Sequence, residues 1–519
     1  MAKPGLLYVT MQPRDSLPAA QFHDWYNNEH GPLRLRLPFV TNGFRYRATD
    51  GLEPEWVALY DVTDMNELTR ESYQALRGDR IKTPREKATM AQIAVDRCVY
   101  DLLDDQNTAN YKPLEEQLDH DADGSVLVAV FLSLPADSAK EDDLNRWYRE
   151  EHIPMLSRVP GWRRSRRFVT ATIDPNAPRE FLALHEYSPS NGLGGPEHKA
   201  TMATPWHDRL MSEVVIQKRR RVYQWAYTFG PAPRELSSLT SPEVAGPWAS
   251  NDGRTRTFPS PSRPVVESFV TTPDGVDLPY RLEGSADPHS PVISFRILRY
   301  LTRGRLRECG ETPIDIDLLA SDIVALLDAL RIPTATLIGV SLGGVTVLNA
   351  ALRYPKRVRR FIACDTNSAS PESNRKAWND RAALAESERA VSPTTQEPII
   401  GEQLAEATTR RWVVDESYST QPEVAARIKE IVCNNSLDGF RKAMQALCAY
   451  DVRSLMAEAQ VPGLFVVGEG DGVLPQTMQQ MVKDLKGDPE LKVIPKAGHL
   501  PMVEQPAVFT EVVNDFLHS

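Results

Sequence analysis

The sequence predicts an α/β protein in two parts: a duplicated unit of strands and helices, then a doubly wound parallel sheet with a helical lid. Three observations support this prediction. Landmarks in residues 5–228 recur at a nearly constant spacing. In the remainder, short apolar strands alternate with amphipathic helices, as in βαβ units. A serine stands in a glycine-flanked turn at residues 339–343, between a strand and a helix.

The composition is that of a folded protein. The chain has 519 residues, 41% hydrophobic and 25% charged, so we expect two to four domains and no global disorder. The net charge of −10 argues against a nucleic-acid partner, and basic clusters at 163–167 and 218–221 are interpreted as solvated strand faces. No run reaches the length that spans a bilayer, and the start of the chain lacks a signal-peptide core. We therefore expect a cytoplasmic protein without a membrane partner.

The cysteines are scattered, odd in number and without CxxC spacing. They are Cys98, Cys309, Cys364, Cys433 and Cys448. This pattern favours a reducing compartment and argues against a disulfide framework or a zinc site. We predict no metal and no organic cofactor.

The duplication rests on four pairs of matching segments. They are 25–32 with 147–154, 43–45 with 161–163, 56–61 with 181–186, and 99–100 with 222–223. Each unit shows the order strand, helix, strand, strand, helix, strand, which is that of a ferredoxin-like fold. We predict ferredoxin-like domains at 1–104 and 125–229, packed sheet to sheet in one intrachain barrel.

Both units contain the pattern Trp-Tyr-x-x-Glu-His-x-Pro. It resembles the EthD-like group of dimeric α/β-barrel proteins. This resemblance implies a role in fungal secondary metabolism, where such proteins include cyclases and decarboxylases acting on aromatic or polyketide compounds. His30 and His152 are candidate acids or bases of a pocket. The alternative is a histidine that holds the helix end by hydrogen bonding, a position where it would serve equally well as a cation. Because Asn28 corresponds to Glu150, one unit can have kept a pocket while the other became scaffold.

The two parts are joined by residues 230–264, which are rich in Pro, Ser and Gly and predict an irregular, semi-extended linker. The second part, 265–519, begins with a hairpin of strands 265–271 and 278–282, which turns at 273–275.

An amphipathic helix follows at 317–330, with apolar residues at the period of a face packed on a sheet. Asp322 and Asp328 are expected to point outward as solvent charges. The mostly helical and polar stretch 366–462 is interpreted as the lid.

Ser341 follows an apolar strand at 335–338 and precedes a helix at 342–353. A serine on such a turn is the nucleophile elbow of an α/β-hydrolase. Asp471 and His499 each follow a later apolar strand, at the edge where a doubly wound sheet places its chemistry. In this triad His499 accepts the proton of Ser341 and Asp471 orients the imidazole. The alternative for each residue alone is an ordinary turn.

Several further segments support one family. They are 302–305, 317–330, 339–344, 354–358, 468–475 and 497–506. With them, residues 264–519 resemble the 3-oxoadipate enol-lactonase branch of the α/β-hydrolases. The resemblance implies hydrolysis of a small-molecule ester or lactone without a cofactor, and leaves a homo-oligomer open. Arg411 and Trp412 resemble a lid position that would face a carboxylate substrate; the alternative is ordinary lid packing.

Residues 291–300 depart from this family. It has a strand there, then a loop whose N–H helps form the oxyanion hole, a helix and the next parallel strand. Adjacent parallel strands need a crossover of about a dozen residues or more. The segment therefore supplies one strand only, and we expect the loop, its helix and a strand to be missing.

The consequence is an oxyanion hole that keeps the N–H of Leu342 and lacks its second donor. Losing one donor typically costs about 10²–10³ in turnover, so hydrolytic activity is in doubt. Either a short coding segment has been lost from the gene model or the hydrolase has degenerated. The alternative function is a weak hydrolase half joined to an EthD-like half that acts as a cyclase, a decarboxylase or a binding module.

Overall fold

The computed structural model describes residues 2–78, 81–284, 296–306, 308–487 and 489–518. The chain forms two compact units. The first comprises Met1–Ser268 and Arg281–Leu298, and the second comprises Phe269–Tyr280 and Arg299–Ser519. Each unit is described by itself below.

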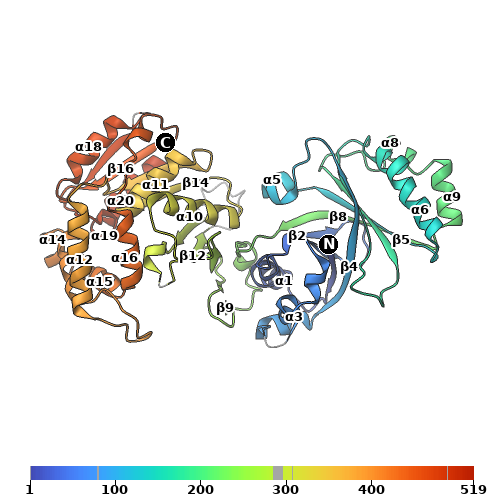
Figure 1. Cartoon of the computed structure of the whole chain (residues 1–519), viewed down its shortest axis with the longest axis horizontal. Helices are drawn as coiled ribbons and strands as arrows, with labels where there is room; N and C mark the ends of the chain where they lie inside the picture. Colours follow the sequence, from blue (N-terminus) through green and yellow to red (C-terminus); the bar gives the residue numbers. More distant parts are fainter. Residues whose placement is uncertain (1, 79–80, 285–295, 307, 488, 519) are drawn as a thin grey trace. The chain divides into compact units, whose positions relative to one another are not determined.

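The first unit is built on a closed antiparallel barrel of eight strands (Figure 1). The strands are β1 (Gly5–Pro13), β2 (Val40–Ala48), β3 (Trp56–Val62), β4 (Ile93–Asn107), β5 (Val126–Ser133), β6 (Trp162–Thr170), β7 (Glu180–Tyr187) and β8 (Gln217–Thr228). Their order around the barrel is β1-β3-β2-β8-β5-β7-β6-β4. Strands β1 to β4 come from the first repeat and β5 to β8 from the second.

Two long strands close the barrel. Strand β4 pairs with β1 of its own repeat and with β6 of the other, while β8 pairs with β5 and β2. The two repeats are therefore joined edge to edge, rather than only packed sheet to sheet as the sequence suggested. The physical reason is that closure pairs the backbone groups that open sheet edges would expose.

Side chains alternate between two faces of the barrel wall. Leu6 and Tyr8 belong to an interior cluster with residues of the second repeat, and the Tyr8 hydroxyl lies 3.0 Å from that of Tyr223. Leu7 and Val9 instead pack outward, in a cluster with the first repeat's helices. Because the interior is filled, a binding site in this unit would lie on an outer face, between strands and helices.

Both Trp-Tyr-x-x-Glu-His segments form a π-helical turn. The turns are η1 (Tyr26–His30), which follows α1 (Ala19–Trp25), and η4 (Tyr148–His152), which follows α6 (Ser138–Trp147). Such turns are rare and frequently occur at functional sites.

The segment expected to be an irregular linker is partly ordered. It contains the short strands β9 (Trp248–Ala249) and β10 (Arg256–Phe258), which pair with each other, and β10 also pairs with β11 (Val265–Thr271). Side chains of the first repeat hold its start, since Asn28 accepts a hydrogen bond from the Glu235 N–H at 3.0 Å. These long-range contacts are not visible in the composition of the segment.

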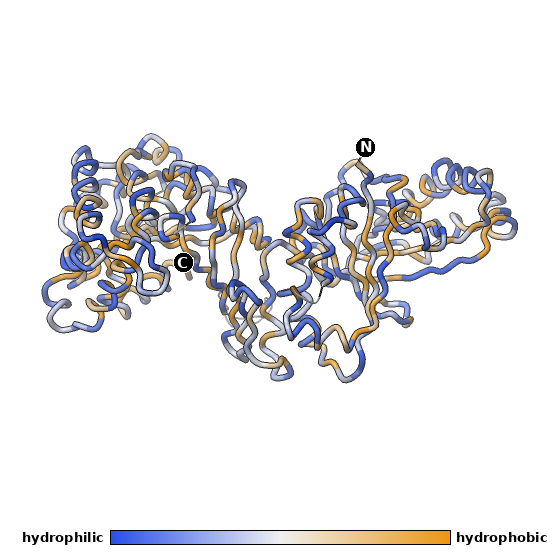
Figure 2. The backbone as a smooth tube through the Cα atoms, turned by 60° about the horizontal axis from the view of Figure 1, so that its bottom comes forward, coloured by the Kyte–Doolittle hydropathy of each residue, from blue (hydrophilic) through white to orange (hydrophobic). Residues whose placement is uncertain are grey.

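The second unit contains a parallel sheet in the order β14-β15-β16-β17. The strands are β14 (Ala335–Val340), β15 (Val358–Cys364), β16 (Gly463–Gly468) and β17 (Glu490–Ile494). Helices α10 (Ile316–Ala329), α11 (Leu342–Arg353) and α18 (Leu474–Asp484) share one hydrophobic cluster with one face, and α20 (Pro506–His518) shares another with the opposite face. Figure 2 shows hydrophobic segments inside this unit and hydrophilic helix segments around them. The predicted doubly covered sheet is present.

Helix α10 differs from the prediction at one residue. Asp322 does not point into solvent: it is 2% exposed and accepts two hydrogen bonds of 2.7 Å from Arg303. Arg303 also donates two bonds of 2.7 Å to Asp274. The prediction failed because a charge on the apolar face is tolerated when a buried guanidinium pairs with it. Asp328 is exposed and pairs with Arg357.

Strand β14 lies at the edge of its sheet. Within the described residues it pairs with β15 only, and Ile338 is 49% exposed. Strand β13 (Arg296–Tyr300) belongs to a separate sheet, of order β13-β12-β11-β10-β9 with β12 (Asp277–Gly284). The strand predicted at 291–294 lies outside the described residues. A strand in the interior of a parallel sheet would be buried on both faces, and β14 is not.

The lid region is helical and has a small hydrophobic cluster of its own. Its helices are α12 (Asn374–Glu388), α13 (Glu402–Trp412), α14 (Asp415–Thr420), α15 (Pro422–Cys433), α16 (Leu437–Ala446) and α17 (Arg453–Met456). Among the helices that the structure describes, none has the length and hydropathy needed to cross a bilayer.

Candidate active site

Ser341 occupies a strained turn between β14 and α11. Its backbone has φ 58° and ψ −119°, a conformation that costs free energy for a residue with a side chain and is typical of functional turns. The neighbouring glycines allow the turn. A Cβ on Gly339 would lie 2.1 Å from the Gly343 oxygen, and one on Gly344 would lie 2.7 Å from the Cys364 oxygen. The local geometry is that of a nucleophile elbow.

His499 and Asp471 form a hydrogen-bonded pair. Asp471 follows β16 and His499 follows β17, and His499 Nδ1 lies 2.7 Å from Asp471 Oδ2. Their side chains are 12% and 14% exposed. A carboxylate that accepts from Nδ1 leaves Nε2 free to accept a proton. Strands β14, β16 and β17 are parallel, so all three predicted triad residues stand at the carboxyl edge of one sheet.

A second carboxyl group, which sequence reasoning missed, lies beside this pair. Asp365 directly follows β15, is 1% exposed and accepts a 2.9 Å hydrogen bond from the Gly468 N–H. One of its carboxyl oxygens lies within 4.8 Å of the ligand atoms of Asp471 and His499. Burial, and then the Asp471 charge, raise the pKa of Asp365 to about 9. Asp365 is therefore protonated at neutral pH.

This protonation predicts the pH dependence of stability. Between the ordinary pKa of 3.8 and the folded value of about 9, the folded protein binds one proton more than the unfolded chain. The free energy of unfolding then decreases with rising pH, by up to about 1.4 kcal/mol per pH unit. Asp365→Asn, which cannot ionise, should lose this slope and be more stable than the wild type at pH 8. Urea unfolding at pH 5, 6.5 and 8 measures the difference.

Asp451→Asn is the matched control, because Asp451 is exposed and its hydrogen bonds to Arg453 lower its pKa to about 2. Its slope over the same pH range should equal that of the wild type. Parallel pH profiles for wild type and Asp365→Asn would show that Asp365 is ionised in the folded protein.

The lid region contacts the loop that carries His499. The His499 N–H donates to the Trp412 carbonyl at 2.7 Å, and the Trp412 ring stacks on the imidazole with centroids 5.6 Å apart. Buried Glu504 accepts from the Gly498 N–H at 2.7 Å and from the Val414 N–H at 3.0 Å. Trp412 thus contacts the site directly, and Glu504 is a second residue that the sequence did not single out.

Arg411 is exposed, but desolvation of its guanidinium by the surrounding protein lowers its pKa to about 10. The charge of Arg381 lowers this pKa further, and the charge of Asp471 raises it. Its guanidinium carbon lies 6.0 Å from the Trp378 ring centroid. Because its charge interacts with that of Asp471, Arg411 is a cation that could attract an anionic group toward Asp471 and His499.

Leu342 is the first residue of α11, so its N–H has no partner one turn earlier in that helix. The sequence predicted this N–H as an oxyanion-hole donor. The segment expected to have carried the second donor falls partly outside the described residues, and among the described strands β14 pairs only with β15.

The grouping of Asp365, Asp471 and His499 also raises the question of a metal. Two ligands of one tetrahedral zinc, each about 2.0–2.1 Å from the ion, stand about 3.3 Å apart. The 2.7 Å separation of His499 Nδ1 and Asp471 Oδ2 is that of a hydrogen bond. The geometry fits a histidine held by a carboxylate.

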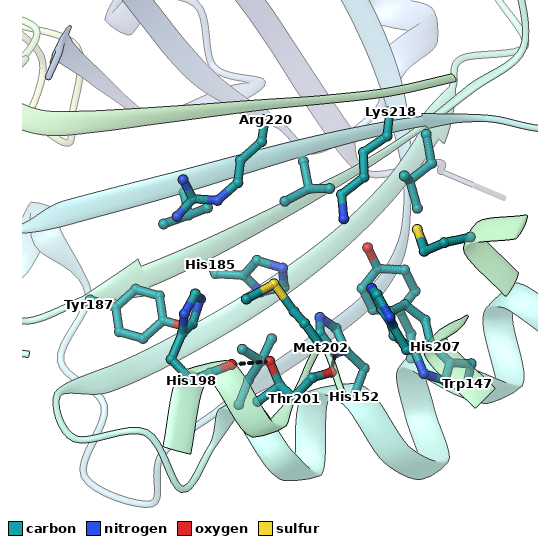
Figure 3. Close-up of a pocket in the computed structure, with 16 residues that line it drawn as sticks. Trp147, His152, His185, Tyr187, His198, Thr201, Met202, His207, Lys218 and Arg220 are labelled. Carbon is teal, nitrogen blue, oxygen red and sulfur yellow. Dashed lines mark hydrogen bonds between the residues drawn. The ribbon is translucent and has the colours of Figure 1, made fainter. Parts of the chain in front are cut away.

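The two candidate histidines of the first unit have different surroundings. His30 is buried, with Nδ1 2.7 Å from Glu86 Oε1, and burial followed by the charge of Arg34 lowers its pKa to about 3. His152 has Nδ1 3.2 Å from the Thr201 carbonyl, and its pKa is also well below the usual value because of burial and His185. These lowered pKa values favour the neutral imidazole at both positions, and each Nδ1 has a partner, as expected of a histidine that holds a helix end by hydrogen bonding. His152 lines a pocket between strands and helices of the second repeat (Figure 3).

Comparison with known proteins shows to which family the second half of the chain is similar. Residues 302–506 match the family model described as alpha/beta hydrolase fold. The chain is 30% identical over 220 residues to 3-oxoadipate enol-lactonase 2 of Acinetobacter baylyi, covering 42% of this chain and 76% of that protein. It is 27% identical over 216 residues to the 2-hydroxymuconate semialdehyde hydrolase of a Pseudomonas strain, covering 40% and 72%.

A solved structure is similar over about half of this chain. The enol-lactonase of Burkholderia xenovorans is 25% identical, and the alignment covers 48% of this chain and all of that one with a TM-score of 0.43. The family model and the Acinetobacter relative are sufficient for assignment. The chain belongs to the α/β-hydrolase fold family and is a hydrolytic enzyme.

Proposed function

We propose that this enzyme hydrolyses a small-molecule ester or lactone, with Ser341 as nucleophile, His499 as base and Asp471 as orienting acid. The observation that supports this most directly is the 2.7 Å contact between His499 and Asp471, at the sheet edge that also bears the Ser341 turn. No metal or organic cofactor enters this chemistry.

The proposed reaction runs in two stages. His499 Nε2 takes the hydroxyl proton as Ser341 Oγ attacks the carbonyl carbon, and Asp471 stabilises the imidazolium. The carbon–oxygen bond to the leaving group then breaks, and His499 returns the proton to that oxygen. In a lactone the leaving alcohol stays attached to the acyl group. Water then attacks the acyl-enzyme, releasing a carboxylic acid and restoring Ser341.

The substrate class follows from the relatives and from the lid. The Acinetobacter relative is named for an enol-lactone of 3-oxoadipate, a compound that carries a carboxylate. Arg411 supplies a cation near Asp471, and the Trp412 ring covers His499. We infer an ester or lactone with an anionic substituent.

In the proposed enzyme the oxyanion hole lacks the second donor that its family has. The edge position of β14 and the exposure of Ile338 support the proposal that the chain lacks a strand and the crossover carrying the second donor. The strand and crossover could be missing because a short coding segment was lost from the gene model, or because the natural gene lost it. Sequencing the mature transcript across the codons for Ser290 to Tyr300 separates them: extra in-frame codons indicate the first, and the printed junction indicates the second.

A fluorophosphonate probe tests the nucleophile. We expect the full-length protein to be labelled once, and peptide mass spectrometry to place the adduct on Ser341, because only an activated serine attacks phosphorus readily. Ser341→Ala should abolish labelling. Exposed Ser373, the residue before α12, provides the matched control, since Ser373→Ala should label like the wild type. An adduct at another residue, or no labelling of folded protein, would contradict the proposed triad.

A second function is favoured by the first unit. The closed barrel, the repeated element order and a pocket beside His152 support tandem ferredoxin-like, EthD-like domains at 1–104 and 125–229. They would act as a cyclase, a decarboxylase or a binding module. Loss of function on replacing His30 and His152, with retention in Ser341→Ala, would support this alternative.

We also propose a cytoplasmic location, which is consistent with the five free cysteines, and a homo-oligomeric state.

A further inference from the structure

The turn that follows β15 contacts two other parts of the candidate active site. On one side it holds the nucleophile turn: the Ser341 N–H donates to the Cys364 carbonyl at 2.9 Å, and the Thr366 hydroxyl donates to the Ser341 carbonyl at 2.8 Å. On the other side, Asp365 Oδ1 accepts a 2.9 Å hydrogen bond from the N–H of Gly468, the last residue of β16. Asp365 therefore stands between the nucleophile turn and the strand that leads to the proposed acid.

The backbone of Asp365 has an unusual conformation. Its φ of 46° lies in the left-handed region, which residues with a side chain adopt rarely and which persists where the surroundings hold it. Two hydrogen bonds to β16 hold it here, one from the Asp365 N–H to the Val466 carbonyl at 2.9 Å and one from the Gly468 N–H to Oδ1. A Cβ on Gly468 would overlap the Gly498 oxygen. The position of Asp365 is thus fixed relative to β16, and β16 is packed closely against the loop of His499.

The second carboxyl oxygen of Asp365, Oδ2, lacks a donor. It is buried, and none of the described residues donates a hydrogen bond to it. The carboxyl group of Asp471 lies close enough for a hydrogen bond between the two side chains. Two ionised carboxylates cannot form such a bond, because both can only accept. A proton on Asp365 would make its carboxyl a donor to Asp471, and would remove the cost of a buried oxygen without a partner.

The nearest acidic groups favour this proton. Asp471 follows β16, and Glu504 ends α19 (Pro501–Glu504). Burial has the largest effect on the pKa of Asp365 and raises it, and the charges of Asp471 and Glu504 raise it further. The Gly468 N–H acts in the opposite direction but does not outweigh them. Among the residues that the structure describes, no Lys or Arg forms an ion pair with Asp365.

The other titratable groups nearby interact with Asp471. His499 Nδ1 lies 2.7 Å from Asp471 Oδ2, and the charge of Arg411 also interacts with Asp471. A negative charge on Asp471 is opposite in sign to that of Arg411 and accepts from the imidazole N–H. The Cys364 thiol supplies no charge, because burial raises its pKa. The two carboxyl groups therefore share one proton and one negative charge, with the proton on Asp365.

We propose that Asp365 is a positioning residue of the hydrolase site, whose protonated carboxyl donates a hydrogen bond to Asp471 and holds that carboxylate against His499. This inference rests on the proposed triad and adds a fourth residue to it. A carboxylate that accepts from a donor on each side is fixed in orientation, and so is the imidazole that it contacts. When Asp365 ionises, the donor is lost and two neighbouring carboxylates repel each other.

Two replacements of Asp365 separate the hydrogen-bond donor from the space that the side chain fills. Asp365→Leu has a similar volume and no donor. Its kcat for p-nitrophenyl acetate should fall about 10- to 100-fold, the effect of losing a hydrogen bond to a charged group, with little change in KM. Asp365→Asn has an N–H donor and should recover most of this loss. Wild-type kcat should also fall as the pH rises through about 9, where Asp365 ionises, and Asp365→Asn should show no such fall.

Infrared spectroscopy of the full-length protein detects the proton without requiring activity. At pH 8 the wild type should show the carbonyl stretch of a protonated carboxylic acid that Asp365→Asn lacks. Asp471→Asn should shift this band, because it changes the acceptor. Asp451→Asn is the matched control and should leave the band unchanged, since Asp451 is exposed and its hydrogen bonds to Arg453 lower its pKa to about 2.

Equal losses of kcat in Asp365→Leu and Asp365→Asn would show that Asp365 only fills space, and a wild-type rate in Asp365→Leu would exclude a role in positioning. Either result would overturn the proposal, as would a spectrum of Asp365→Asn that lacks no wild-type band. If Asp365→Leu does not fold, the infrared spectra and the pH profile of Asp365→Asn decide. Failure of the proposed function gives a different result, with no labelling of Ser341 and no esterase activity. The band and its shift in Asp471→Asn would still show whether Asp365 donates to Asp471.

Discussion

Asp471→Asn is expected to lower kcat for ester hydrolysis by about 10⁴, with little change in KM. His499 Nδ1 lies 2.7 Å from Asp471 Oδ2, and in the proposed triad this carboxylate stabilises the imidazolium that would form during attack. An asparagine keeps the shape but can donate to Nδ1, which favours the wrong imidazole tautomer. Hydrolysis of p-nitrophenyl acetate by the purified full-length variant measures the loss.

The control for this experiment is a variant of the neighbouring carboxyl group, Asp365→Asn. Asp365 is protonated at neutral pH, so Asp365→Asn should change kcat less than Asp471→Asn does. If instead Asp365→Asn were the more damaging variant, Asp365 would be the acid of the triad. A normal rate in Asp471→Asn would exclude the proposed role of Asp471.

Arg303→Met should destabilise the hydrolase unit by about 3–5 kcal/mol. Arg303 is 1% exposed and bridges Asp322 and Asp274 through paired hydrogen bonds of 2.7 Å. Its guanidinium holds the pKa of Asp274 well below the usual range, whereas burial raises the pKa of Asp322. Without Arg303, Asp322 would stand in the interior without a counter-charge. Chemical denaturation of the full-length variant, followed at the transition of this unit, measures the cost.

Arg357→Met is the matched comparison, because its partner Asp328 lies on the same helix as Asp322. Arg357 pairs with Asp328, whose side chain is 62% exposed, and such exposed pairs contribute about 0–1 kcal/mol. The double variant Arg303→Met with Asp322→Asn should recover part of the loss, because it also removes the buried charge. Similar destabilisation by Arg303→Met and Arg357→Met would show that Arg303 has no special role.

The elements that the sequence predicted well are those with a local cause. The strand and helix around Ser341 were predicted at 335–338 and 342–353, and the structure has them at Ala335–Val340 and Leu342–Arg353. Glycines are needed there because neighbouring backbone leaves no room for a Cβ. The order of Asp471 and His499, each after a parallel strand, follows from the fold in the same way.

The residues that were missed depend on contacts between distant segments. Asp365 follows a strand just as Asp471 does, and that shared position was the available signal. Its pairing with Asp471 depends on which strands are neighbours in the sheet. Asp322 was expected in solvent because helical periodicity cannot reveal Arg303, which precedes the helix. In each case the partner is too far away in the sequence for a local pattern of residues to include it.

The sequence by itself determined the duplication, the hydrolase half and the three residues proposed as its triad, because repeats, strand ends and tight turns are local patterns. Only the tertiary structure decided how the repeats close into one barrel, that β14 pairs with β15 alone among the described strands, and which face of β8 each basic residue occupies. Strand pairing and burial are long-range properties. They arise when segments far apart in the chain compete for the same hydrogen bonds and the same apolar surface.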